Sequence, residues 1–190
     1  MDTGNWITLA AMIGGLMAFL AGLMQYRRAQ RWKRAEFVAG EVKEFKADPM
    51  VRTALLLLDW NERAVELFPH DGDPEKRTVR VADRTIGEAL VPHTMRSEFS
   101  RVEIALRDTF DRFFDRLERF EYFLEAGLVR PREFAPYLKY WLNILGNDRS
   151  GRKPPEVVHA IWLYLDFYYA EVISLLRRFG YRIRPVRTGR

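Results

Sequence analysis

The sequence of 190 residues contains no cysteine, and this absence excludes several kinds of chemistry. Without thiols there is no disulfide framework, no thiolate zinc site and no cysteine nucleophile. Histidine is scarce too, with three copies at positions 70, 93 and 159. The glycine-rich motifs that bind phosphates or dinucleotides are missing, as are the nucleophilic-serine and zinc-protease motifs. We therefore expect no cofactor and no metal site.

Internal repeats and strand signals are also nearly absent. No period of 20 to 50 residues recurs, which argues against a solenoid, and the only short strand-like run is VRV at 79–81. The chain is 48% hydrophobic, which is typical of a folded protein. The helical periodicity of most segments predicts an all-α fold, with one helical bundle over residues 48–180 and a basic tail over 181–190.

Asp48 as cap and Pro49 in the first turn are expected to start a helix, and the apolar stretch 51–68 has the pattern of a buried helix. A short helix capped by Asp83 and reaching about Val91, and one long closing helix from near Pro155 to Gly180, are also expected.

The clearest helix prediction covers residues 101–126. Ser100 and Glu103 have the spacing of a capping box, and Gly127 provides a stop. Apolar residues recur alternately four and three apart, which predicts a buried seam: Leu106, Phe110, Phe113, Leu117, Phe120 and Leu124. Opposite charges four residues apart predict an exposed face that neutralises itself; the pairs are Arg107/Asp111, Asp108/Arg112 and Asp115/Arg119.

The first part of the chain is uncharged for a long stretch. From Trp6 to Met24 no residue carries a charge, and this length suits a transmembrane helix of about 20 residues. Asp2 precedes the stretch and cations follow it, which places the carboxyl side in the cytoplasm. We expect an uncleaved transmembrane anchor over 1–26, a helical stalk over 27–47, and a single-pass protein of the inner membrane.

A basic cluster follows the uncharged stretch. Because it would lie beside the membrane, we expect it to set the topology and contact anionic lipid rather than nucleic acid. The five cations are Arg27, Arg28, Arg31, Lys33 and Arg34.

Small residues recur every fourth position within the uncharged stretch. Ala10, Gly14, Ala18 and Gly22 share one helix face, and such a face lets two helices approach closely. The row predicts self-association of the chain. The alternative is that glycine and alanine are simply common in apolar helices.

One pair of residues suggests catalysis. Arg152 lies seven residues before His159, with the arginine in a loop and the histidine near the start of a helix. A fixed cation beside a titratable imidazole meets the needs of metal-independent RNA cleavage through the 2′-hydroxyl. The alternative interpretation makes Arg152 a loop charge and His159 a partly buried residue near Trp162.

This arrangement resembles HEPN-type proteins, which are helical domains with an R-x4–6-H motif, and more specifically the membrane-anchored accessory proteins of Cas13b-type CRISPR systems. The resemblance covers the architecture of most of the chain and the residues Arg152 and His159. It implies assembly into a membrane pore in bacterial antiviral defence. It also implies that these two residues would be the catalytic pair if the chain is a ribonuclease.

Three functional hypotheses follow. The first is a membrane protein that homo-oligomerises, as an effector or pore in antiviral defence. The second is a membrane-tethered HEPN-like ribonuclease. The third is a non-catalytic membrane scaffold that recruits a cytoplasmic protein partner. The six arginines of the segment 177–190, with Phe179 and Tyr181 among them, suit either RNA or anionic lipid.

Overall fold

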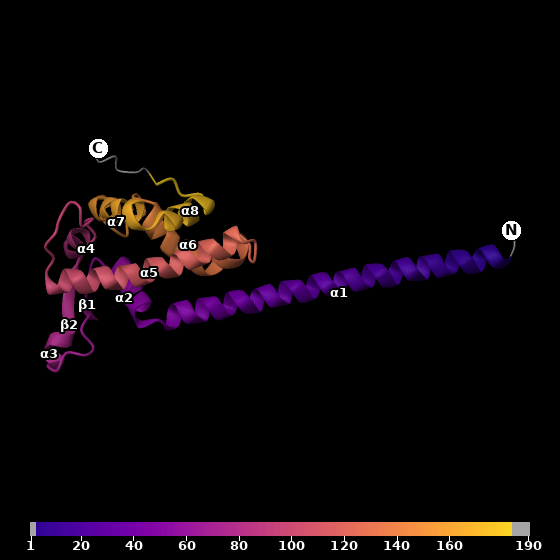
Figure 1. Ribbon diagram of the computed structural model, residues 1–190, viewed down its shortest axis with the longest axis horizontal. Helices are drawn as coiled ribbons and strands as arrows, with labels where there is room; N and C mark the ends of the chain where they lie inside the picture. The colour runs from indigo at the N-terminus through magenta and orange to yellow at the C-terminus, as the bar shows by residue number, and fades with distance from the viewer. Residues whose placement is uncertain (1–2, 184–190) are drawn as a thin grey trace. The chain divides into compact units, whose positions relative to one another are not determined.

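The computed structural model describes residues 3–183, and side chains from Met12 onward. Within this range the chain is mostly helical, with one small antiparallel sheet (Figure 1). The helices are α1 (Thr3–Ala47), α2 (Pro49–Asp59), α3 (Pro74–Arg77), α4 (Asp83–Ala89), α5 (Arg101–Glu125), α6 (Pro131–Gly146), α7 (Pro155–Tyr168) and α8 (Ala170–Arg178), and the strands are β1 (Glu62–Glu66) and β2 (Thr78–Ala82).

The chain divides into two compact units, residues 1–40 and 41–190, and the boundary falls inside α1. The described part of the first unit, from Thr3 onward, is therefore one helix, without a break between the apolar and basic stretches. Among the residues whose side chains are described, no helix is both long and apolar enough to cross a membrane.

This finding corrects two predictions. The transmembrane anchor over residues 1–26 and the single-pass location in the inner membrane are both contradicted. The anionic-lipid role of the cations from Arg27 to Arg34 depended on that location. In the structure these side chains lie on the same continuous helix, and all but Arg34 are exposed.

The second unit begins with the last turns of α1 and the start of α2. Asp48 caps α2, because its carboxylate accepts hydrogen bonds from the backbone amides of Met50 and Val51. Pro49 occupies the first turn, as expected. Helix α2 ends at Asp59, and the chain then enters β1, so the helical pattern of 51–68 continues only to its middle.

The two strands form a hairpin that the sequence hardly indicated. Glu62 pairs with Ala82 and Glu66 with Thr78 across the antiparallel ladder. One face of the hairpin is anchored by Val65 and Val81, which are both buried. The VRV run therefore lies in β2, and its partner strand β1 was predicted as helix.

Helix α5 organises the core and confirms the strongest helix prediction. Its capping box between Ser100 and Glu103 is formed in both directions. All six residues of the predicted seam from Leu106 to Leu124 are buried. Helix α5 contacts α2, α4 and α8, and Figure 1 shows the hairpin and α3 on the side of α5 opposite to α7 and α8.

The charged side chains of α5 pair differently from the prediction. Arg112 lies 2.7 Å from the Asp48 carboxylate, and Arg119 lies 2.7 Å from the Glu41 carboxylate. In the part of the chain that the structure describes, none of the three predicted pairs within α5 is an ion pair. The charges attach α5 to the end of α1 and the start of α2, because acidic residues there lie within reach.

The closing helix is interrupted, whereas the sequence predicted one long helix from Pro155 to Gly180. Tyr169 leaves the helical region with φ −135° and ψ 57°, and it separates α7 from α8. Its ring packs 5.3 Å from that of Phe114 on α5. The break between α7 and α8 therefore coincides with the packing of the Tyr169 ring against α5.

Candidate functional site

Arg152 is held by groups from two helices. Its guanidinium donates a hydrogen bond of 3.1 Å to the Tyr140 hydroxyl of α6 and lies 3.1 Å from the Asp59 carboxylate of α2. The Tyr140 hydroxyl also donates to Asp59, and this hydrogen bond raises the pKa of Tyr140. The cation of Arg152 is therefore matched by a carboxylate and fixes its loop to α2 and α6.

His159 has a separate set of neighbours. Its Nε2 lies 3.4 Å from the Asp148 carboxylate, and its ring centroid lies 5.2 Å from that of Trp162. The proximity to Trp162 agrees with the non-catalytic interpretation. No interaction in the described part of the chain joins Arg152 to His159. An ion-paired guanidinium is less available to a phosphate group than the free cation that the proposed cleavage requires.

A buried ion pair lies close by in sequence and was not predicted. The Lys153 ammonium donates to the Asp83 carboxylate and, over 2.7 Å, to the backbone carbonyl of Trp60. The Lys153 side chain is completely buried. Burial raises the pKa of Asp83 and lowers that of Lys153, since a medium of low polarity disfavours both charged forms.

This pair borders a cavity of about 460 Å³ between α4 and α7. Asp83, Glu88 and Glu156 supply carboxylates to its lining, while Val91 and Val157 supply apolar surface. The second carboxylate oxygen of Asp83 is buried without a hydrogen-bond partner. The pair joins three segments of the chain, namely the loop before α7, the start of α4 and the residue that follows α2.

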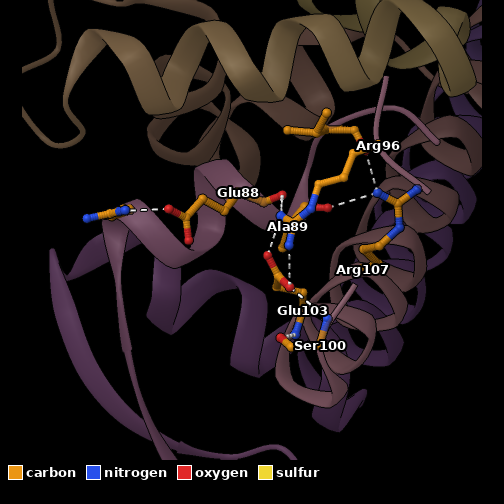
Figure 2. A network of polar contacts seen from close by, with 8 residues as sticks. Glu88, Ala89, Arg96, Ser100, Glu103 and Arg107 are labelled. Carbon is orange, nitrogen blue, oxygen red and sulfur yellow. Dashed lines mark hydrogen bonds and ion pairs between the residues drawn. The ribbon is translucent and has the colours of Figure 1, made fainter. Parts of the chain in front are cut away.

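A polar network fixes the loop between α4 and α5 (Figure 2). Arg96 contacts both carboxylate oxygens of Glu103, at 2.5 and 3.0 Å, and donates to the Glu88 carbonyl. Arg107 of α5 donates to the carbonyls of Ala89 and Val91, at 2.8 and 2.7 Å. Glu88 and Ala89 are the last two residues of α4 and Val91 lies just beyond it, so the two arginines satisfy backbone acceptors that the end of the helix leaves open.

His93 lies at the edge of the same loop. It contacts the Tyr168 hydroxyl through its ring, and its backbone amide donates to the same oxygen over 3.0 Å. The ring also meets Phe167 edge to face, with centroids 5.7 Å apart. The loop cavity of about 490 Å³ beside it is open and mostly polar, which provides no enclosed place for a substrate.

The predicted self-association face can be followed for three of its four members. The side chain of Ala10 lies outside the described residues. Gly14, Ala18 and Gly22 are exposed, and a Cβ atom added at either glycine would meet no atom within 4 Å. The face is therefore open and flat within the first unit.

The structure also describes the turn at residues 70–73 and the first residues of the basic tail. No group of three potential ligands among the described residues could hold a metal ion. In the HDGD turn, Asp71 accepts a hydrogen bond from the Asp73 amide and pairs with Arg101 over 2.7 Å. The tail of 181–190 is described to Ile183, which is buried, and its remaining residues lie outside the described range.

No family model, curated protein or solved structure matches the chain. The similarity to HEPN-type proteins is therefore neither supported nor contradicted, and it stays a prediction. The functional argument depends on the contacts and exposed surfaces of the chain itself.

Proposed function

We propose that the chain is a non-catalytic assembly protein, in which the α1 helices of several copies associate and thereby gather several copies of the domain formed by residues 41–183. The observation that supports this proposal is the exposure of apolar side chains along α1. Met17, Phe19 and Met24 are 66%, 67% and 69% exposed. They belong to a described stretch of α1 that is apolar on all sides.

Exposed apolar surface of this extent favours association. Burying one large apolar side chain contributes about 1.5–3 kcal/mol, and α1 exposes several in succession: Met12, Ile13, Leu16, Met17, Phe19, Leu20 and Met24. Contiguous apolar patches on folded proteins commonly mark interaction surfaces. A helix gains most of its stability by packing an apolar face, so association would also stabilise α1.

A second copy of the same helix is the partner that α1 fits best. The flat face of Gly14, Ala18 and Gly22 allows two helix axes to approach closely. The large apolar side chains beside this face would then be buried against the partner helix. The small residues thus determine where the helices touch, and their large neighbours supply the free energy.

Light scattering on the full chain in detergent-free buffer tests this proposal. We expect a mass of several copies, and we expect a smaller mass when Gly14, Ala18 and Gly22 are all replaced by leucine. The matched control, Ala35→Leu with Ala39→Leu, adds the same kind of bulk to α1 outside the row and should leave the mass unchanged. A monomeric wild-type chain would refute the proposal, and an unchanged mass in the triple variant would exclude the small-residue face.

Metal-independent ribonuclease activity stays a prediction, and the separate partners of Arg152 and His159 do not favour it. We expect the full chain to leave single-stranded RNA intact in the presence of a chelator. Cleavage that disappears in both Arg152→Ala and His159→Ala would instead make the chain an enzyme. Cleavage that persists in both variants would indicate a contaminant.

A further inference from the structure

A groove separates β1 from α2 in the second unit, and we call it the β1 groove. Its volume is about 380 Å³. Met50 and Leu56 of α2 contribute apolar surface on one side, and Ala64 and Val65 of β1 line the other. Met50 is 40% exposed. The groove therefore combines an accessible apolar wall with one strand of a two-stranded sheet.

The backbone of β1 has hydrogen-bonding groups that face away from β2. The Leu67 amide donates to the Arg77 carbonyl, and the Asp83 amide donates to the Asn61 carbonyl. Both bonds join odd-numbered positions at the ends of this strand to the ends of the other strand, so the odd-numbered residues of β1 are the ones whose backbones hydrogen-bond to β2. In an antiparallel ladder the alternate residues point their amides and carbonyls outward, and on β1 these are Glu62, Ala64 and Glu66.

The outward groups remain available for pairing. Ala64 and Glu66 are exposed and both line the β1 groove. Within the described residues, no element other than β2 offers their backbones a hydrogen bond. An unpaired strand edge accepts an additional extended chain, whose backbone provides affinity while its alternate side chains enter neighbouring pockets.

The charges of the groove favour an acidic partner. Arg52 of α2 and Arg63 of β1 line it, and neither is in an ion pair within the described range. Arg63 rests on the Trp60 ring, with its guanidinium carbon 5.2 Å from the ring centroid. Glu66 also lines the groove, but strand alternation directs its side chain to the opposite face of the hairpin from Arg63.

We propose that the β1 groove binds an extended peptide segment of a partner protein by strand addition to β1. The segment carries acidic side chains toward Arg52 and Arg63, and apolar side chains toward Met50 and Leu56. This inference goes beyond the assembly function and does not depend on it, because every residue involved lies in residues 41–183. Gathering several copies of the groove would strengthen the capture of a partner that carries several such segments.

The test is selection from a synthetic pool of random octapeptides on the immobilised full chain, followed by fluorescence anisotropy with the enriched peptides. We expect enrichment of peptides that alternate acidic and β-branched residues. Arg52→Glu should weaken their binding about fivefold, since it replaces an attraction by a repulsion at an exposed site. Arg132→Glu is the matched control, because Arg132 is an exposed arginine of α6 that does not line the groove and forms no ion pair within the described residues, and this variant should bind as wild type does.

A second measurement separates strand addition from charge attraction alone. Hydrogen exchange of the Ala64 and Glu66 amides should slow when the peptide binds, and Ala64→Pro should abolish binding while leaving the far-ultraviolet spectrum unchanged. A pool without enrichment, or enriched peptides without acidic residues, would overturn the proposal. So would unprotected amides at Ala64 and Glu66 in the bound state. A monomeric chain that still binds these peptides would refute the assembly function and retain this one.

Discussion

Replacing Lys153 by methionine is expected to destabilise the second unit more than any exposed substitution. The lysine side chain is completely buried, and its ammonium donates to Asp83 and to the carbonyl of Trp60. Methionine fills a similar volume but has no hydrogen-bond donor. The substitution therefore leaves a carboxylate and a carbonyl without their partner inside the protein.

The magnitude follows from the burial of both partners. Removing one member of a buried ion pair costs about 3–5 kcal/mol, because the remaining charge stays desolvated and unpaired. A second variant separates this cost from the loss of packing. In Lys153→Met with Asp83→Ala no buried charge remains, and the unpaired carbonyl of Trp60 costs about 1–3 kcal/mol. The double variant should therefore be more stable than the single one.

Urea unfolding of the full chain, followed by circular dichroism and tryptophan fluorescence, measures both free energies. The control is Lys139→Met, which changes an exposed lysine and should shift the free energy of unfolding by less than about 0.5 kcal/mol. A cost below about 1 kcal/mol for Lys153→Met, or a double variant less stable than the single one, would refute the reasoning.

The pH dependence of the free energy of unfolding tests independently whether the cost of Lys153→Met comes from the charge left on Asp83. Without Lys153, burial raises the pKa of Asp83 further above its ordinary value of 3.8. Between 3.8 and the folded-state pKa, the native protein then binds more protons than the unfolded chain. The stability of the single variant should therefore rise as the pH falls through this window and level off below 3.8. A penalty that stays constant with pH would contradict a charged origin.

Two further substitutions test the packing of the second unit. Gly146→Ala would place a Cβ atom 2.6 Å from the Cβ and Cγ atoms of Tyr181, so it should lower the free energy of unfolding in urea by about 1–3 kcal/mol. Gly87→Ala has its nearest contact at an ordinary 4.0 Å and should raise the free energy of unfolding by about 0.5–1 kcal/mol. Arg178→Ala should cost about 3 kcal/mol, because Glu121 is only 2% exposed and accepts hydrogen bonds from that guanidinium; a loss below about 0.5 kcal/mol would contradict this.

Local patterns predicted the helices whose signals lie within one segment. The capping box at Ser100 and the seam from Leu106 to Leu124 determine α5, because both depend on residues three or four apart. The same holds for Asp48 and Pro49 at the start of α2. Such signals do not need the rest of the fold, so they are visible in the sequence.

The features that were missed depend on partners distant in sequence. β1 was predicted as helix because its apolar pattern continued that of α2, and only pairing with β2 makes it a strand. Asp83 was predicted as a helix cap, whereas Ala82 is the N-cap and Asp83 pairs with Lys153. The break at Tyr169 likewise depends on packing against α5.

The candidate catalytic pair illustrates the limit of spacing arguments. A separation of seven residues is compatible with one site, but it does not determine which groups each side chain meets. Asp59 and Tyr140 come from other helices and bind the Arg152 guanidinium, while Asp148 contacts the His159 ring. No pattern in the sequence indicates that these residues meet, because they come together only in the folded chain.

Cysteine crosslinking tests self-association through α1 most directly, because the chain has no cysteine of its own. A disulfide requires two Cα atoms within about 7 Å, so it forms between copies only where their helices touch at the substituted position. We predict that Ala18→Cys gives a disulfide-linked dimer under mild oxidation, whereas Leu20→Cys, on another face of α1, gives little. Absence of the dimer at position 18, or equal crosslinking at both positions, would contradict the account.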